Sequence, residues 1–580
     1  MRQKTLCDTF FHGCEQGAQD DRFRRKRSGN WESVSIHQFK EMVRQISGAL
    51  RAHGIGKGDR VALLSYNRIE WAASDYGILT AGATTVPLYS TLPSDQCDYI
   101  LRDCAAKLII VEDEEQYNKV AHLQETVRIV SITGTGGEKW ETFLAKGADC
   151  TDEIHRKHAD EVSENDLATF VYTSGTTGKP KGVMLTHRNL VSNILSTQDV
   201  LDMVEGDVAL SFLPLSHIFE RTLDYGLFFQ GATIAYAEHI DKVAENVSEV
   251  RPTILAAVPR FYEKVYARIQ ESVAAMPNRR KKIFHWALRV GREESEYRIR
   301  NEKAPFWLRL KFNIASRLVF RKIHDRVGGR IKVFLSGGAP LAQKIAEFFF
   351  SAGFVVLEGY GLSETSPVLT VNYRGATRLG TVGKPVPGVD LKIADDGEIL
   401  ARGPNIMQGY YNMPEETRAV LTEEGWFHTG DIGEFDSDGF LRITDRKKDL
   451  AKTSGGKYIA PQPIENQLKL HPAVLNAVIV ADQRNFPSAL LVPDMDFLRS
   501  HLQLTEKEEQ LLLHPEVTNL YEEVLSSVNK ALAPFEQPKK FRLLPKDFEL
   551  SEGEITPTMK IRRRVIEKKY QKVIDEMYES

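Results

Sequence analysis

Residues 172–182 read Tyr-Thr-Ser-Gly-Thr-Thr-Gly-Lys-Pro-Lys-Gly, and they follow the apolar run Leu167-Ala-Thr-Phe-Val-Tyr172. Glycines let backbone N–H groups close around phosphate oxygens, hydroxyls add neutral donors, and Lys179 and Lys181 add positive charge. The pattern predicts a polyphosphate-binding loop between a strand and a helix capped by Thr186. A flexible, solvated loop is the alternative, because the segment does not match the Walker pattern Gly-x-x-x-x-Gly-Lys-Ser/Thr.

The residues before this loop alternate between helical and strand patterns. Apolar residues recur with a helical period over 39–50 and 69–79, and buried-strand runs occupy 61–64, 84–88 and 108–111. Strands separated by amphipathic helices predict a parallel, layered α/β sheet. Ligands are then expected at the carboxyl ends of the strands.

Size and composition limit the classes of protein that fit. A chain of 580 residues is too long for one core, so two to four domains are expected. The net charge of -3 argues against a general nucleic-acid binder. The five cysteines lack the paired spacing of a zinc site or a dithiol motif, which favours reduced thiols in the cytoplasm. No apolar run approaches the roughly 18 residues of a membrane span, so any membrane contact is expected to be peripheral.

Two further motifs follow predicted strands. Ser336-Gly-Gly-Ala-Pro340 comes after the strand pattern 331–335, and Glu358-Gly-Tyr-Gly-Leu-Ser-Glu-Thr365 comes after 354–357. Both are expected to be strand-end loops. Tyr360 offers a ring that can stack on a base, and Glu364 offers a carboxylate that can hold Mg²⁺. Together with the loop at 172–182 they predict one nucleoside triphosphate site.

Three other segments have both a functional and a structural interpretation. His217 lies among apolar residues in Leu213–Arg221, where a histidine is usually part of the core. Asp431, within Gly425–Lys452, can accept hydrogen bonds from ribose hydroxyls or simply belong to a turn. The charge run Asp445-Arg-Lys-Lys-Asp449 is typical of a solvated connector.

Residues 279–332 are strongly basic. They contain seventeen Lys or Arg and five Asp or Glu, interleaved with Phe and Trp. Basic and aromatic residues at helical spacing can lie on an anionic membrane surface or attract phosphorylated ligands. Solvated helices with ordinary core faces explain the composition equally well.

Taken together, these motifs resemble the adenylate-forming enzymes, the superfamily of acyl-CoA synthetases, peptide-synthetase adenylation domains and luciferases. The match covers nearly the whole chain in order. Gly425–Lys452 is similar to the signature of fatty acyl-CoA synthetases, and Leu213–Arg221 with Lys452–Pro461 looks most like long-chain, bacterial members. Ala451 departs mildly, because a larger aliphatic residue is common there.

The resemblance implies an α/β fold in two parts. Residues 1–445 are expected to form a large N-terminal domain of layered α/β sheets with a small distorted β-barrel part, carrying the ATP and acyl sites. Residues 446–580 are expected to form a small, mobile α+β C-terminal domain, with a hinge at 445–449.

The resemblance also implies roles for individual residues. Lys560, His217 and Glu364 are expected to be catalytic, with Thr173 and Glu364 holding Mg²⁺. The residues expected to bind ATP or AMP are Thr173, Ser174, Gly175, Thr176, Thr177, Gly178, Lys179, Gly338, Ala339, Pro340, Gly359, Tyr360, Gly361, Ser363, Asp431 and Arg446. Those expected at the hinge or the coenzyme A channel are Lys447, Lys448, Lys452, Gly455 and Gly456, although the two glycines also fit a plain turn. Phe212, Phe219, Tyr225, Phe228 and Phe229 are candidates for the acyl pocket or for the core.

The implied activity is ATP-dependent ligation of a long-chain fatty acid to coenzyme A through an acyl adenylate. The alternatives are an acyl-AMP ligase that loads a carrier protein, a medium-chain or aromatic acyl-CoA synthetase, and a non-catalytic sensor with the same fold. A serine hydrolase is disfavoured, because no Gly-x-Ser-x-Gly elbow occurs. We expect a cytoplasmic enzyme with no nucleic-acid partner, with peripheral membrane contact through 279–332 and a homodimer as further expectations.

Overall fold

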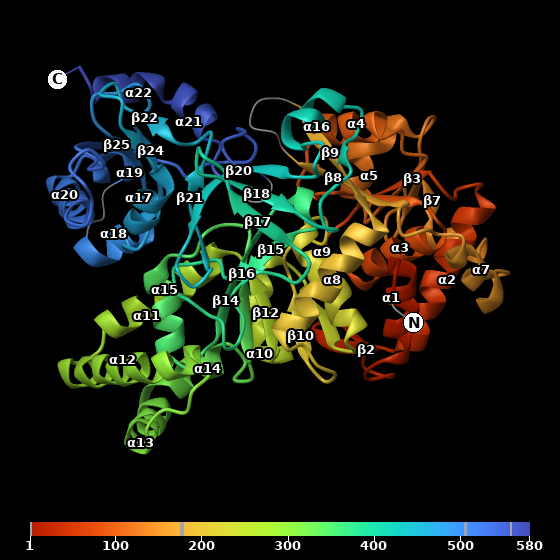
Figure 1. Cartoon of the computed structure of the whole chain (residues 1–580), viewed down its shortest axis with the longest axis horizontal. Coiled ribbons are helices and arrows are strands. Elements are labelled where there is room, and N and C mark those ends of the chain that lie inside the picture. The colour runs from red at the N-terminus through yellow and green to blue at the C-terminus, as the bar shows by residue number, and fades with distance from the viewer. Residues whose placement is uncertain (1–2, 174–178, 504–506, 557–559, 580) are drawn as a thin grey trace. The chain divides into compact units, whose positions relative to one another are not determined.

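The computed structural model describes residues 3–173, 179–503, 507–556 and 560–579 (Figure 1). These residues form two compact units. The first unit comprises 1–261, 276–392 and 400–428, and the second comprises 262–275, 393–399 and 429–580. The chain passes between the two units more than once. This division does not test the single domain boundary expected near residue 445, which stays a prediction.

The first unit contains an eight-stranded sheet in the order β19-β9-β8-β4-β3-β5-β6-β7. Its middle strands are parallel, and all three strand patterns expected before residue 150 are present in it. Their residues are buried on both sides of the sheet, as expected of a sheet covered on both faces. The strands are β3 (Arg60–Leu64), β4 (Thr84–Leu88), β5 (Leu108–Val111), β6 (Arg128–Ser131), β7 (Glu138–Lys139), β8 (Leu167–Thr173), β9 (Lys181–Thr186) and β19 (Gly409–Tyr410).

A nine-stranded sheet, in the order β16-β15-β14-β13-β12-β10-β11-β1-β2, completes the first unit. Its five central strands, β14, β13, β12, β10 and β11, are parallel, so their carboxyl ends meet at one edge. The strands are β1 (Phe23–Arg27), β2 (Asn30–Val34), β10 (Val208–Ser211), β11 (Thr233–Tyr236), β12 (Ile254–Ala257), β13 (Val333–Ser336), β14 (Val356–Gly361), β15 (Val368–Val371) and β16 (Lys384–Pro385).

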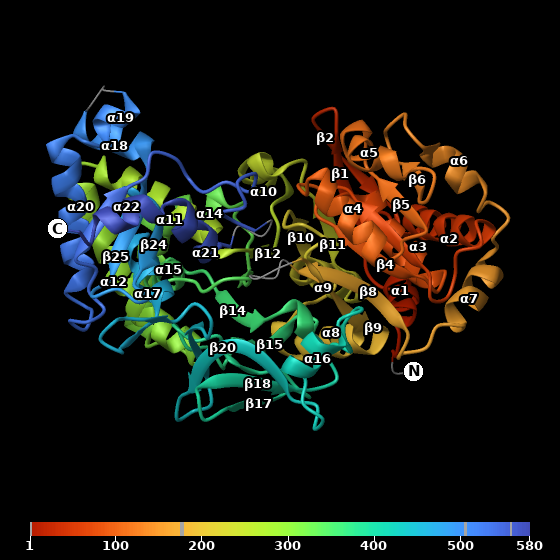
Figure 2. The same ribbon diagram turned by 90° about the horizontal axis from the view of Figure 1, so that it is seen from above.

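Helices fill the space between these two sheets (Figures 1 and 2). All twelve residues of α3 (Ile69–Thr80) are buried, which confirms the helix expected over 69–79. One apolar core joins side chains of both sheets to this helix and to α1 (Leu6–Glu15), α2 (Ile36–Ala52), α8 (His187–Leu201) and α9 (Ile218–Phe229). The layered α/β fold class expected from the sequence is therefore confirmed.

Further helices belong to the first unit. They are α4 (Ser94–Asp103), α5 (Glu114–Val120), α6 (Trp140–Ala145), α7 (Asp152–Asp160), α10 (Val243–Val250), α12 (Asn278–Ile299), α13 (Phe306–Ala315), α14 (Arg321–Arg326), α15 (Gln343–Ser351) and α16 (Pro414–Val420). Helix α11 (Pro259–Ala274) lies mostly in the second unit.

The connection after residue 173 differs from the expectation of a strand, a loop and a helix. Residues 174–178 lie outside the described part of the chain, and β9 follows them as an antiparallel partner of β8. The expectation was wrong because Val183 and Leu185 of β9 are apolar and join the core. Helix α8 begins after this strand, and Thr186 caps it as expected, with the Thr186 hydroxyl accepting from the backbone N–H of Asn189 at 3.1 Å.

The segment 358–361 also differs from its expected form. It is the end of strand β14, not a loop beyond it, and Tyr360 pairs with Thr370 of the antiparallel β15. A side chain cannot be added at Gly361, because its Cβ would lie 1.7 Å from the carbonyl oxygen of Pro367. The glycine therefore lets β15 approach β14, and the strand extends further than the apolar run 354–357 indicated.

The remaining β structure belongs to a four-stranded sheet and to the second unit. The four-stranded sheet has the order β17-β18-β20-β21, with β17 (Asp390–Ile393), β18 (Glu398–Arg402), β20 (Phe427–Phe435) and β21 (Leu441–Arg446). The second unit has a hairpin, β22 (Ala451–Lys452) and β23 (Tyr458–Ile459), and a three-stranded sheet of β24 (Val474–Val480), β25 (Ser488–Pro493) and β26 (Lys540–Leu543).

The three-stranded sheet separates two apolar cores. Ala477 and Ile479 of β24 face one core, whereas Val478 and Val480 face the other. This alternation is the period of two of a β-strand. The helices of the second unit that pack here are α17 (Pro461–Leu468), α18 (Met495–Leu502), α19 (Glu508–Leu511), α20 (Pro515–Asn529), α21 (Arg563–Lys569) and α22 (Gln571–Glu576).

Candidate active site

The β8–β9 hairpin positions the base of the predicted phosphate loop. Thr173 pairs with Lys181 across the hairpin. The Nζ atom of Lys181 lies 4.9 Å from the centre of the Tyr410 ring, and that of Lys179 lies 5.5 Å from the Tyr99 ring. Ser174, Gly175, Thr176, Thr177 and Gly178 lie outside the described residues.

Glu364 lies beside this hairpin. It belongs to a short 3-10 turn, Ser363–Thr365, directly after β14. The Tyr410 hydroxyl donates a hydrogen bond to Glu364 Oε1 at 2.9 Å, and β19, which carries Tyr410, pairs with β9. Tyr410 therefore links the predicted magnesium carboxylate to a lysine of the phosphate loop. Burial beside this carboxylate raises the pKa of Tyr410 above its usual range, so the phenol stays protonated and continues to donate.

The predicted adenine segment lies in the strand that leads to Glu364. Gly359, Tyr360 and Gly361 are the last residues of β14, and all three are half-buried. The strand before them is fully buried, and desolvation raises the pKa of Glu358 to about 8. Glu358 is therefore largely protonated at neutral pH, whereas Glu364 is half-buried at the end of the strand.

The 336–340 motif begins with Ser336, the last residue of the neighbouring parallel strand β13. Gly338 has a φ of +81°, which favours glycine, and Gly338, Ala339 and Pro340 are exposed as a strand-end loop should be. A Cβ placed on Gly337 would lie 3.1 Å from the Phe219 ring. The glycine therefore allows the 213–221 segment to pack directly against this loop.

His217 is the N-cap residue of α9. Its Nδ1 accepts a hydrogen bond from the backbone N–H of Phe219 at 3.2 Å, and the residue is half-buried. Asn67 holds the preceding turn, because its side chain donates to the carbonyl of Leu213 at 2.6 Å and accepts from the N–H of Leu215 at 2.8 Å. His217 thus lies at the edge where β10, β13 and β14 end, and not in the deep core that its apolar neighbours suggest.

A buried ion pair fixes the helix that begins at His217. The Nε atom of Arg221 on α9 donates to Asp75 Oδ2 on α3 at 2.7 Å, and both side chains are about 1% exposed. Arg221 Nη1 also donates to the Thr169 hydroxyl of β8 at 2.7 Å, and the Tyr225 hydroxyl donates to Asp75. This network joins α9 to the strand that ends at Thr173, so it sets the relative position of two predicted site residues.

The second unit holds the predicted ribose aspartate. Asp431 on β20 is buried, and Arg446 on β21 approaches its Oδ1 with Nε at 3.4 Å. They line a cavity of about 240 Å³ with Thr429, Gly430, Lys447 and Lys448. Lys447 forms ion pairs with Asp396 at 2.6 Å and with Glu398 at 3.0 Å. Four residues predicted for nucleotide binding or the hinge are therefore brought together in one cavity.

The two predicted channel glycines form the turn of the β22–β23 hairpin. Both are exposed; Gly456 has a φ of +79°, and no heavy atom lies within 4 Å of the position that its Cβ would take. In the first strand of this hairpin, the backbone N–H of Lys452 donates to Asp482 Oδ1 at 3.1 Å. Gly455 and Gly456 therefore form a turn, as the structural interpretation of these two glycines predicted. The space around the Cβ position of Gly456 is unoccupied.

Lys560 lies next to an antiparallel bridge between Ile555 and Ile561 of the same unit. Residues 557–559 lie outside the described part of the chain. The backbone N–H of Thr556 donates to the carbonyl of Lys560 at 2.8 Å, and the N–H of Lys560 donates to the Thr556 hydroxyl at 3.1 Å. These bonds hold the backbone of Lys560 in a defined place.

Comparison with known families identifies the chain. The sequence pattern of the AMP-binding enzymes matches residues 12–411, and the pattern described as the AMP-binding enzyme C-terminal domain matches residues 448–580. The chain belongs to the AMP-binding enzyme family. The resemblance inferred from the motifs is therefore confirmed.

Curated relatives match this AMP-binding enzyme over nearly its whole length. A long-chain-fatty-acid–CoA ligase, FadD15, from Mycobacterium bovis is 35% identical, with 96% of this chain and 94% of the relative covered. The human long-chain-fatty-acid–CoA ligase ACSBG1 is 32% identical, with 96% and 82% covered. Among solved structures, the adenylation domain of a carboxylate reductase from Mycobacterium chelonae has a TM-score of 0.78 at 21% identity, with 99% and 91% covered. At this sequence identity, the comparison with the solved structure shows a shared fold only.

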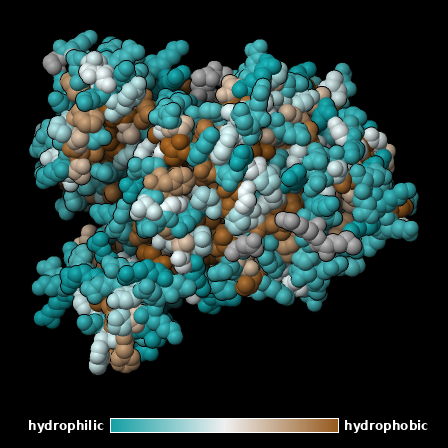
Figure 3. Space-filling view, in the orientation of Figure 1, coloured by the Kyte–Doolittle hydropathy of each residue, from teal (hydrophilic) through white to brown (hydrophobic). Residues whose placement is uncertain are grey.

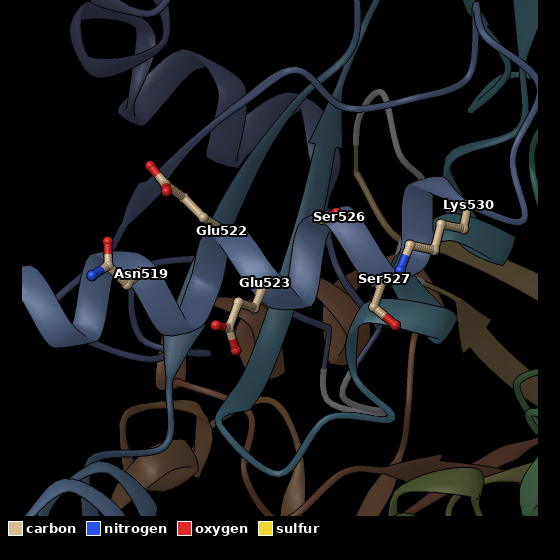
Figure 4. A pocket seen from close by; sticks show the side chains of 6 residues that line it. All are labelled: Asn519, Glu522, Glu523, Ser526, Ser527 and Lys530. Atoms are coloured by element: carbon tan, nitrogen blue, oxygen red, sulfur yellow. The ribbon is translucent and has the colours of Figure 1, made fainter.

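The acyl-pocket candidates differ in how deeply they are buried. Phe228 packs among Phe10, Phe23 and other core aromatic residues, and Tyr225 belongs to the buried ion-pair network, so these two acyl-pocket candidates are core residues. Phe229 is also buried, whereas Phe212 and Phe219 are half-buried. A depression of about 490 Å³ lies along the exposed side of α20, and Figure 4 shows that its lining side chains come from that helix and from Lys530, which caps its C-terminus.

Sequence reasoning missed Tyr410 and Tyr99. Tyr410 contacts Glu364, which lies 46 residues earlier, through strand β19 of only two residues. No local pattern distinguishes such a short strand from a loop. The pairing of Gly409 and Tyr410 with β9 is a tertiary contact, so only the folded structure reveals it.

Proposed function

We propose that this enzyme joins a long-chain fatty acid to coenzyme A through an acyl adenylate, with release of AMP and pyrophosphate. The observation that carries the proposal is the sequence identity of 35%, over 96% of the chain, to a relative named long-chain-fatty-acid–CoA ligase. The cluster of Lys181, Tyr410 and Glu364 beside the β8–β9 hairpin supports a site for a charged nucleotide.

The first half-reaction brings two anions together, the fatty carboxylate and ATP. Their approach costs Coulomb energy unless cations neutralise it. In the proposed arrangement Lys179 and the 173–178 loop bind the β and γ phosphates, Tyr360 stacks on adenine, and Asp431 accepts hydrogen bonds from ribose. The loop of Gly338, Ala339 and Pro340 borders the same nucleotide site. One oxygen of the carboxylate attacks the α-phosphorus, and pyrophosphate leaves.

Magnesium fits the residues at the hairpin. The described residues contain no cluster of three His, Cys, Asp or Glu side chains that could hold a metal by themselves. Mg²⁺ usually binds one or two carboxylates together with waters and substrate phosphates, which the half-buried Glu364 and the hydroxyl of Thr173 suit. When bound, the ion would neutralise charge on the phosphates. The hydrogen bond from Tyr410 would hold one oxygen of Glu364 and leave its other oxygen for the metal.

Lys560 is proposed to contact the α-phosphate and the substrate carboxylate in this first step. Its ammonium group would stabilise the negative charge that develops as the carboxylate oxygen approaches the α-phosphate. His217 is proposed to border the carboxylate end of the acyl site. Its place at the N-terminus of α9, two residues before the Phe219 ring that packs against Gly337, supports that role. The half-buried Phe212 and Phe219 remain candidates for the start of the acyl pocket.

The second half-reaction is attack of the coenzyme A thiol on the carbonyl carbon of the acyl adenylate. The C–S bond forms, the C–O bond to AMP breaks, and the thiol proton is lost to solvent or a base. We propose that the second unit reorients at 445–449 between the steps, so that the Gly455-Gly456 turn replaces Lys560. Missing side chains there would leave room for the narrow pantetheine arm.

The test is a comparison of acceptors. The protein is incubated with ATP, Mg²⁺ and palmitate, together with either free coenzyme A or a phosphopantetheinylated carrier protein. We expect palmitoyl-CoA and AMP with the free thiol. Thioester only on the carrier would instead identify a carrier-loading enzyme, and a profile over chain lengths would separate long-chain from medium-chain or aromatic acids.

Substitution of Gly456 tests the channel. Gly456→Phe should lower the rate of thioester formation by at least tenfold and leave pyrophosphate exchange nearly unchanged, because the ring would fill space that only the thiol uses. Gly439→Phe is the matched control, since Gly439 also has a φ of +80° and open space at its Cβ position. Equal thioester rates in the two variants would contradict a channel at this turn.

Two expectations about the protein in the cell are part of the proposal. We place it in the cytoplasm, which the five free thiols, four of them buried, support. Within the described residues no helix is both long and apolar enough to cross a membrane. The expected homodimer stays a prediction.

A further inference from the structure

We propose that one side of helix α13 is a peripheral docking surface for an anionic lipid membrane. The α13 face consists of five apolar side chains: Phe306, Trp307, Leu310 and Ile314 of α13, and Leu318 of the π-helical turn Ser316–Phe320 that follows it. The proposal rests on the exposure, spacing and charge of this segment and not on the ligase activity.

The α13 face is directed outward because the other side of the helix is anchored. Ala315 is fully buried, and the ring of Phe312 packs 5.9 Å from that of the buried Phe320. Arg298 of α12 lies over the Phe312 ring at 5.5 Å. Helix α13 is therefore fixed on α12 through one side, and the residues three and four positions apart on its other side project into solvent.

Exposed apolar side chains are concentrated on this face and not scattered over the surface. Phe306 is 69% exposed and Trp307 is 71% exposed. Of the thirteen large apolar side chains that are exposed among the described residues, five belong to this one segment. Figure 3 shows tan and brown residues among hydrophilic ones at the lower left, where Figure 1 places α13. Exposed apolar patches bordered by polar residues are typical of protein or membrane contact sites.

The positive charge of the same segment indicates an anionic partner. Residues 303–322 contain six Lys or Arg and no Asp or Glu. No carboxylate of the described chain forms an ion pair with any of the six, whereas Lys26 elsewhere has three glutamates within 3.5 Å. The basic residues of this segment are Lys303, Arg309, Lys311, Arg317, Arg321 and Lys322. Apolar and aromatic side chains on one face, surrounded by basic ones, are the pattern of a helix that lies in a membrane interface.

A second copy of the chain fits this face poorly. In a symmetric dimer the same patch faces itself, so the six positive charges of one copy would lie against the six of the other. An anionic lipid surface instead offers negative charge to the basic residues and an apolar layer to Trp307 and Phe306. No helix of the described chain is long and apolar enough to span a membrane, so α13 would lie in the plane of the surface and not cross it.

The experiment is sedimentation with lipid vesicles. The full-length protein is mixed with vesicles of phosphatidylglycerol and phosphatidylcholine, or of phosphatidylcholine alone, at low and high salt. We expect binding to the anionic vesicles, weaker at high salt, and at least tenfold weaker binding to the neutral ones. Phe306→Ser/Trp307→Ser should reduce binding to anionic vesicles at least tenfold. Since each basic residue near such a surface is worth a factor of about five, Arg309→Gln/Lys311→Gln/Arg317→Gln should reduce it about a hundredfold.

Matched variants separate this face from general effects. Ile240→Ser/Leu513→Ser removes two exposed apolar side chains elsewhere, which are 58% and 82% exposed. Lys139→Gln/Lys157→Gln/Arg188→Gln removes three exposed charges elsewhere. Both controls should bind vesicles as the unmodified protein does. All variants should keep the unmodified helical circular dichroism signal.

Three results would overturn the proposal. The first is no binding of the unmodified protein to anionic vesicles. The second is equal binding by the α13 variants and their controls. The third is a dimer in solution that Phe306→Ser/Trp307→Ser dissociates without any change in vesicle binding, because that would assign the face to a second copy of the chain.

Discussion

Lys560→Ala is expected to abolish adenylate formation and to spare the thioester step. In the proposed mechanism the ammonium group of Lys560 meets the charge that develops between the carboxylate and the α-phosphate. Loss of a preorganised group of this kind commonly costs a factor of about 10²–10³ in rate. Fatty-acid-dependent exchange of labelled pyrophosphate into ATP measures this step, and it should fall by at least that factor.

The second half-reaction is measured separately by adding pre-made palmitoyl adenylate and coenzyme A. Lys560→Ala should form palmitoyl-CoA at a rate within a fewfold of the unmodified protein, since Lys560 is proposed to leave before the thiol enters. Lys568→Ala is the control, because Lys568 is an exposed lysine of the neighbouring helix α21. Equal loss of both half-reactions in Lys560→Ala would refute the role assigned to this lysine.

Asp75→Ala is expected to cause the largest loss of stability in the first unit. It removes the carboxylate that pairs with Arg221 and leaves a buried guanidinium without its counter-ion. Breaking a buried pair from one side typically costs about 3–5 kcal/mol, because the remaining charge is not solvated. Urea unfolding followed by circular dichroism should therefore show an earlier transition for the variant.

Two comparisons test whether the unpaired charge is the cause. Asp98→Ala removes the partner of Arg102 in an exposed pair at 2.9 Å, which should shift the unfolding transition far less than Asp75→Ala does. The double variant Asp75→Leu/Arg221→Met removes both charges and should recover much of the lost stability. If Asp75→Ala and Asp98→Ala unfold at similar urea concentrations, the network does not stabilise the layer between the two sheets.

Strands buried on both faces were predictable, because their sequences are short, continuous apolar runs. The runs 61–64, 84–88 and 108–111 all form strands, and the helical period over 69–79 forms α3. Strand β9 was not predicted, because it follows the phosphate loop directly and its residues precede a strong helix cap at Thr186. Its pairing with β8 depends on a core that is assembled from distant segments.

Motifs identified candidate residues of the site but not the contacts that organise them. Arg221 was part of the 213–221 motif, yet its partner Asp75 lies 146 residues earlier, and nothing local connects them. The Tyr410–Glu364 hydrogen bond was hidden for the same reason. Similarly, the composition of 279–332 indicated basic and aromatic helices, but the side of α13 that faces solvent is decided by its packing on α12.

Oxygen-isotope transfer tests the acyl-adenylate mechanism most directly. Palmitate labelled with ¹⁸O in both carboxylate oxygens is incubated with the protein, ATP, Mg²⁺ and coenzyme A, and the nucleotide product is analysed by mass spectrometry. If the carboxylate attacks the α-phosphorus and the thiol then displaces AMP, one labelled oxygen stays on the phosphate. The account predicts AMP that carries one ¹⁸O atom per palmitoyl-CoA formed; unlabelled AMP, or label in inorganic phosphate together with ADP, would contradict it.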